Sequence, residues 1–173
     1  FSPACCLNFV SIKKRTVMKV KSTIVALLVL LSCQEICAKA IDTTSVVSIG
    51  GIQQFISIKG KDVSNPLLLY LHGGPGAAVS SHSEQVTGDL ENHFVVVHWD
   101  QRGSGKTLEL NNHSGIPSMD MMKQDAEEIL FHLLERFERK QLILLGNSWG
   151  TILGFHLALT YPNKVQSFIA VSP

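Results

Sequence analysis

Short apolar runs alternate with longer amphipathic stretches along the chain from about residue 41 onward. Unbroken apolar runs suit strands that are buried on both faces of a sheet. On this pattern we predict strands at residues 46–49, 52–58, 67–71, 94–99, 142–145 and 165–171. Helices are predicted at residues 80–92, at residues 119–137 and from the turn at Ser148 to Tyr161. The alternation predicts an α/β fold whose mainly parallel sheet is covered by helices on both faces.

A serine stands between the fifth predicted strand and the helix that follows it. The apolar run Leu142–Leu145 leads directly into Gly146-Asn-Ser148-Trp-Gly150. A serine at the tip of such a strand–turn–helix lies on a strained backbone, which leaves its hydroxyl accessible. Glycine at positions 146 and 150 lets the strand and the helix approach, and the N–H of Trp149 would point at a developing oxyanion. We predict Ser148 as a nucleophile; the alternative is an ordinary turn with a glycine-flanked serine.

Two further loops follow buried strands, and ligands bind at the carboxyl ends of strands in such sheets. The first loop, His72-Gly73-Gly74-Pro75-Gly76, is rich in glycine and would let a second oxyanion donor approach the substrate. Its alternative is a tight turn with no chemical role. His72 is not predicted to be the base, because the triad base of this fold follows the serine along the chain. The second loop runs from Asp100 to Gly105, and Asp100 and Arg102 are expected to brace it beside the serine.

The second loop also ends in Gly105-Lys-Thr107, which suggests a phosphate-binding loop. That motif needs a glycine at position 100, where this chain has aspartate. It also needs a helix after Thr107, whereas residues 108–117 are rich in Asn, Gly and Pro. We therefore predict no nucleotide site. No Cys and His residues have the spacing of a zinc site, so neither a metal nor a cofactor is predicted.

The first forty residues have the pattern of an export signal. From Met18, a charged start is followed by the apolar run Ile24–Leu31 and by the cleavage pattern Ala38-Lys-Ala40. Eight apolar residues fall short of the ~20 that span a bilayer. Lipidation at Cys33, after a loose lipoprotein box, and an uncleaved anchor are the alternatives.

This pattern divides the chain into three segments. Residues 18–40 are predicted to be a signal peptide, and residues 1–17 to be upstream translation or a cut end. Residues 41–173 are then the exported domain, secreted or held in the cell envelope, and membrane contact is expected only in the alternative in which Cys33 is lipidated.

Charge and cysteine content change once the export signal is set aside. Residues 41–173 carry 9 basic and 13 acidic groups and sum to −4, and they contain no cysteine. Without a basic patch or basic–aromatic interleaving, a nucleic-acid partner is not expected. A secreted domain without disulfides must be held together by its core. Glu127 and Glu128 are expected on a solvated helix face, not as paired catalytic carboxylates.

Three motifs in this order resemble the proline iminopeptidase family of α/β-hydrolases. They are His72-Gly-Gly-Pro-Gly76, Asp100-Gln-Arg-Gly-Ser-Gly105 and Gly146-Asn-Ser-Trp-Gly150. The likeness runs from about Gly51 to the last residue. It implies an α/β-hydrolase fold and a serine peptidase that removes an N-terminal residue, typically proline, from peptides. By motif match, Ser148 is the nucleophile, and Gly74 and Trp149 are the oxyanion donors.

The resemblance leaves the substrate and the rest of the triad open. Relatives in this family include esterases and amide hydrolases, so a peptide, a small amide or an ester is the expected substrate. Family members continue with further strands and a helical cap, which carry the triad Asp and His. Residues 41–173 match only the N-terminal part of that domain, up to about the sixth strand, and are expected to be inactive alone. A truncated product without catalysis is the remaining alternative, and the oligomeric state is not predicted.

Overall fold

The computed structural model describes residues 39–111 and 116–173. The predicted signal peptide lies almost wholly outside these residues, as does Cys33. The strands are β1 (Ile41–Ile49), β2 (Ile52–Gly60), β3 (Leu67–Leu71), β4 (Val95–Asp100), β5 (Leu142–Asn147) and β6 (Val165–Val171). The helices are η1 (Ser80–His82), α2 (Ser83–Thr87), η2 (Gly88–Asn92), α3 (Gly105–Asn111), α4 (Met119–Arg136) and α5 (Trp149–Thr160). Within the described part of the chain, no helix is long and apolar enough to cross a membrane.

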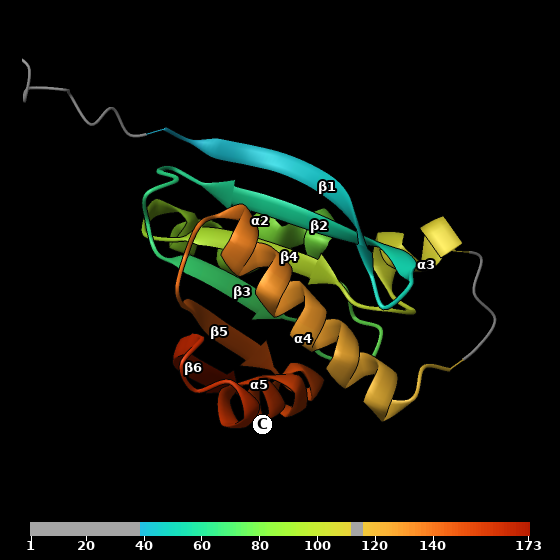
Figure 1. Ribbon diagram of the computed structural model, residues 1–173. Coiled ribbons are helices and arrows are strands. Elements are labelled where there is room, and N and C mark those ends of the chain that lie inside the picture. The colour runs from blue at the N-terminus through green and yellow to red at the C-terminus, as the bar shows by residue number, and fades with distance from the viewer. Residues whose placement is uncertain (1–38, 112–115) are drawn as a thin grey trace, which may run out of the picture. The chain divides into compact units, whose positions relative to one another are not determined.

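The strands form a single sheet in the order β1-β2-β4-β3-β5-β6 (Figure 1). Strands β4, β3, β5 and β6 are parallel, whereas β1 and β2 form an antiparallel hairpin at one edge. The mainly parallel sheet is therefore confirmed. The parallel strands place the ends of β3, β4 and β5 at one edge, where the three predicted loops begin.

The hairpin is longer than the apolar pattern predicts. β1 begins at Ile41, not at residue 46, and pairs with β2 from Ile41 opposite Gly60 to Ile49 opposite Ile52. Its first residues alternate between partly buried and exposed side chains, because an edge strand buries only one face. That segment has no unbroken apolar run, so the criterion that found the inner strands missed it.

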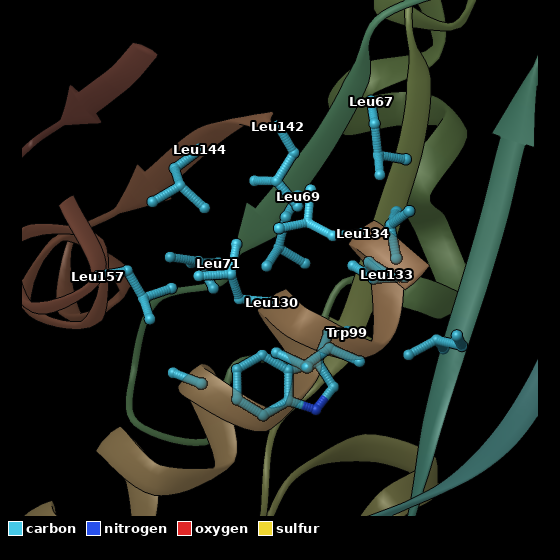
Figure 2. Close-up of a cluster of buried hydrophobic side chains, with 14 of the residues drawn as sticks. Leu67, Leu69, Leu71, Trp99, Leu130, Leu133, Leu134, Leu142, Leu144 and Leu157 are labelled. Atoms are coloured by element: carbon cyan, nitrogen blue, oxygen red, sulfur yellow. The ribbon is translucent and has the colours of Figure 1, made fainter. Parts of the chain in front are cut away.

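One face of the sheet is covered by α4 and α5, and Figure 1 shows both helices in front of it. Leucines of β3 and β5 meet the apolar side of α4 in a buried cluster, with Leu157 of α5 at its margin (Figure 2). α4 begins where Ser118 caps it, since the Ser118 hydroxyl accepts a hydrogen bond from the N–H of Met121 at 3.2 Å. The helix predicted at residues 119–137 is confirmed.

The other face has a smaller cover. Leu68, Tyr70 and Val96 form a second buried cluster, against which Val79 and Leu90 pack. The single helix predicted at residues 80–92 is three short helical segments instead. This stretch is polar, and its backbone is not helical at His82 and Thr87, where one segment ends and the next begins. Propensity alone could not locate these breaks.

Candidate active site

Ser148 lies at the tip of the turn between β5 and α5. Its backbone has φ 48° and ψ −118°, a conformation that residues other than glycine rarely adopt, and the residue is exposed. A Cβ on Gly146 would lie 2.8 Å from the carbonyl oxygen of Gly150, and a Cβ on Gly150 would overlap the carbonyl of Leu71. Glycine is therefore required at both positions for the strand and helix to approach. The strained serine is held by the end of β6, because its N–H donates to the carbonyl of Val171 at 2.9 Å.

The backbone next to this serine offers two candidate hydrogen-bond donors, the N–H groups of Trp149 and Gly74. Trp149 is the first residue of α5, so its N–H has no acceptor within the helix and remains available. The loop after β3 lies directly against the turn, because a Cβ on Gly73 would be 3.3 Å from the Asn147 carbonyl and 3.4 Å from the Ser148 Cβ. Gly74 follows with φ 120°, which glycine adopts without strain. The structure thus brings Ser148, Trp149 and the Gly74 loop together, and their catalytic roles stay a prediction.

His72 is enclosed by its own loop. It is 1% exposed. Its Nε2 accepts a hydrogen bond from the N–H of Gln101 at 3.1 Å, so the ring proton is on Nδ1, which donates to the carbonyl of Gly73 at 2.8 Å. Burial lowers the pKa of His72, against smaller opposing effects of the hydrogen bond to Gly73 and of the charge on Asp100, and this favours the neutral ring. Both nitrogens therefore hold backbone in place.

Asp100 fixes the loop after β4. Its Oδ2 accepts hydrogen bonds from the Ser80 hydroxyl and from the N–H of Lys106, both at 2.9 Å. The second bond places a carboxylate at the N-terminus of α3, where it satisfies a free N–H. The Pro75 and Gly76 part of the preceding loop is exposed, so Asp100 and its partners form the buried support beside it.

The prediction that no helix accompanies Thr107 is wrong. A helix does follow this loop, α3 from Gly105 to Asn111, although residues 108–117 contain helix-breaking residues. The hydrogen bond from the N–H of Lys106 to Asp100 stabilises the first turn of that helix, which ends at Asn111, ahead of the glycine and the proline of this stretch. Thr107 contacts backbone with its hydroxyl, which donates to the Asp100 carbonyl at 2.5 Å and accepts from the Phe55 N–H at 2.8 Å. The hydroxyl that a phosphate-binding loop would offer to a metal is thus engaged in the fold.

Arg102 forms a buried ion pair that joins this loop to α4. Its Nε and one terminal nitrogen each lie 2.8 Å from a different oxygen of Asp125, and the terminal nitrogen also donates to the Gly50 carbonyl at 2.7 Å. Hydrogen bonding to Asp125 raises the pKa of Arg102. Gln54 links Asp125 to Trp99, donating to the carboxylate at 2.8 Å and accepting from the indole at 2.6 Å. The ion pair therefore has no unpaired oxygen in the carboxylate.

Sequence reasoning missed the partner, although the sequence held a signal for it. Asp125 falls on the apolar stripe of α4, three residues after Met122 and four before Ile129, and it is fully buried. A carboxylate at a core position needs a cation or several donors. Arg102 lies 23 residues away, and only the fold brings the two together.

The acidic pair after Asp125 is not merely a solvated face. Glu127 accepts from His156 Nε2 at 2.7 Å and from the Tyr161 hydroxyl at 2.8 Å, which joins α4 to α5. Glu128 accepts from the N–H of Gly50 at 2.7 Å. The predicted solvated face therefore holds for Glu128, which is exposed, whereas Glu127 is partly buried where α4 meets α5. In residues 39–111 and 116–173, no three His, Cys, Asp or Glu side chains are grouped to hold a metal ion.

A parallel sheet with an exposed serine on a strained turn between strand and helix defines the architecture of an α/β-hydrolase. A family model for the alpha/beta hydrolase fold matches residues 66–173. The chain belongs to this family, as the three sequence motifs predicted.

Relatives with curated names support the closer resemblance. The chain is 38% identical over 136 residues to a Bacillus subtilis protein named "Probable aminopeptidase YbaC", covering 78% of the chain and 42% of that protein. It is 30% identical over 126 residues to the proline iminopeptidase of Lactobacillus helveticus, covering 70% of the chain and 40% of the relative. The chain thus spans less than half the length of these relatives.

Solved structures agree on the fold. A proline iminopeptidase-related protein from Thermus thermophilus superposes with a TM-score of 0.61 at 26% identity, over 75% of this chain and 44% of that one. An epoxide hydrolase from Vigna radiata superposes with a TM-score of 0.58 at 24% identity, over 75% and 38% of the two chains. The likeness to the epoxide hydrolase shows the fold alone. Membership of the α/β-hydrolase family therefore does not by itself identify the reaction that is catalysed.

Proposed function

We propose that this chain carries the nucleophile and the oxyanion donors of a serine hydrolase that releases an N-terminal residue from peptides. The observation that carries the proposal is Ser148, an exposed hydroxyl on a backbone at φ 48° with the free N–H of Trp149 beside it. Strain of this kind persists only where the surroundings enforce it, and it is concentrated at functional sites.

The proposed reaction is acyl transfer. The Ser148 oxygen attacks the carbonyl carbon of the first substrate residue, and the resulting oxyanion accepts hydrogen bonds from the N–H groups of Trp149 and Gly74. One such donor is worth roughly 3 kcal/mol of barrier. The carbon–nitrogen bond then breaks, the amine leaves with a proton, and water releases the acyl group from Ser148.

We assign the base that takes the serine proton to no described residue. In residues 39–111 and 116–173, no side chain is hydrogen-bonded to the Ser148 hydroxyl, and His72 is engaged elsewhere. In the triad order of this fold, the acid and the histidine follow the serine along the chain. The names of the Bacillus and Lactobacillus relatives support an aminopeptidase, preferring an N-terminal proline.

Parallel assays of the whole protein test the proposal. Proline amide and an alanine amide are compared with short acyl esters, at equal enzyme concentration. Faster turnover of the proline amide is the expected result. Turnover of esters alone would favour an esterase on the same scaffold, and turnover of none of them would contradict the proposed hydrolase.

A further inference from the structure

Gln101 is a buried residue that the proposed reaction does not use. It is 1% exposed and directly follows β4. Its backbone N–H donates to Nε2 of His72 at 3.1 Å, and its side-chain Nε2 donates to the carbonyl of His72 at 3.2 Å. The Ser104 hydroxyl donates to the Gln101 carbonyl at 2.6 Å and so fixes the turn that presents these donors. Gln101 therefore holds His72 by both its ring and its backbone.

The side-chain amide of Gln101 is only half satisfied. Its Oε1 is buried and has no hydrogen-bond partner among the described residues. A buried amide oxygen without a partner costs free energy, and an apolar side chain of similar shape would avoid that cost. Stability alone therefore does not explain a glutamine at this position. The one hydrogen bond that its side chain makes, to the His72 carbonyl, points to another role.

His72 transmits this restraint to the loop that flanks Ser148. The Gly73 carbonyl accepts from His72 Nδ1 at 2.8 Å and from the N–H of Ala77 at 3.2 Å. In a planar trans peptide the C=O and N–H groups point in opposite directions. Fixing the Gly73 carbonyl on the His72 side therefore directs the N–H of Gly74 away from it. Since Gly73 packs against the Ser148 turn, a rotation of this peptide would move the donor that the site requires.

We propose that Gln101 is a positioning residue for the Gly74 oxyanion donor and acts through His72. This inference rests on the proposed function, because an oxyanion donor has a role only if Ser148 acylates. Gln101 itself touches no reacting atom. Its loss is expected to lower the rate of the chemical step and to leave substrate binding nearly unchanged, because the donor acts on charge that develops in the transition state.

The test compares two buried glutamines in the whole protein. Gln101→Leu removes the side-chain bond to the His72 carbonyl and keeps the backbone bond to the His72 ring, and Gln101→Met is a second variant of similar length in case the first does not fold. Gln54→Leu is the matched control, since Gln54 is also fully buried but bonds Trp99 and Asp125 and does not touch His72. The measurements are kcat and KM on the best substrate, the rate at which a phosphonate modifies Ser148, and the melting temperature.

Gln101→Leu is expected to lower kcat and the phosphonylation rate about 10- to 100-fold, with KM changed less than about threefold and the melting temperature unchanged or higher. Gln54→Leu is expected to lower the melting temperature and to keep kcat per folded molecule. Equal kcat in wild type and in both Gln101 variants, or a loss of melting temperature alone, would overturn the inference. A wild-type protein that neither turns over substrate nor reacts with the phosphonate would overturn the proposed function instead.

Discussion

Backbone groups carry the geometry around Ser148, whereas side chains carry it between α4 and the loop after β4. At the serine, glycines let the Ser148 turn, the loop after β3 and the start of α5 approach closely, next to an exposed serine. At α4, Arg102, Asp125 and Gln54 form a buried network with every carboxylate oxygen bonded. The first region stores strain, and the second removes the cost of buried charge. The two regions should therefore respond oppositely to substitution, the first in rate and the second in stability.

The largest effect is expected at Ser148. Ser148→Ala removes the nucleophile and should lower kcat by about 10⁶-fold in the whole protein. The hydroxyl bonds no other described residue, so the free energy of unfolding should change by less than about 0.5 kcal/mol. Turnover and denaturant unfolding of the same preparation check both parts. Retention of more than about a tenth of the wild-type rate would remove Ser148 from the mechanism.

The reverse pattern is expected at Asp125. Asp125→Ala leaves the buried guanidinium of Arg102 without its partner and should destabilise the fold by about 3–5 kcal/mol. Turnover per folded molecule should stay within about tenfold of wild type. Urea unfolding and activity at low temperature measure the two quantities. A large loss of kcat at unchanged stability would erase the distinction between the two regions.

These two regions also differ in how far the sequence predicts them. The turn at Ser148 is local, since Gly146, Ser148 and Gly150 and the flanking apolar runs lie within about ten residues, and pattern and sterics suffice. The Arg102–Asp125 pair depends on packing between a loop and a helix, and only the misplaced charge on the apolar stripe of α4 points to it.

The same contrast holds for the secondary structure. The inner strands and α4 follow from unbroken apolar runs and helical spacing. The first half of β1 and the helix α3 do not, because an edge pairing and a side-chain cap decide them. The bonds of His72 were also beyond the sequence, since they depend on the approach of the loops after β3 and β4.

The buried ring of His98 should make the stability of the fold depend on pH. Burial lowers the pKa of His98 from 6.5 to about 4, so the folded protein keeps the ring neutral while the unfolded chain binds a proton below pH 6.5. Stability should therefore fall as the pH is lowered from 6.5 to 4. His98→Gln should reduce that fall by about 3 kcal/mol. Unfolding curves at pH 7 and pH 4 measure it; an unchanged fall in the variant would rule out His98 as its source.

The smallest effect is expected where α4 meets α5. Hydrogen bonds from His156 and Tyr161 outweigh partial burial and lower the pKa of Glu127 below its ordinary value of 4.5. The contribution is present above that ordinary value and is lost as the pH falls through the lowered one. Because the pair is partly exposed, Glu127→Gln should cost less than about 1 kcal/mol at pH 7. Denaturant unfolding of this variant at pH 7 checks it, and a cost as large as that of Asp125→Ala would contradict the ranking.

Covalent labelling of the whole protein with a serine-directed phosphonate, followed by mass spectrometry of its peptides, tests directly whether Ser148 is the nucleophile. We expect one adduct per molecule, on the peptide that contains Ser148, and none in Ser148→Ala. Absence of an adduct in the folded wild-type protein, or an adduct on another serine, would contradict the assignment of Ser148 as the nucleophile.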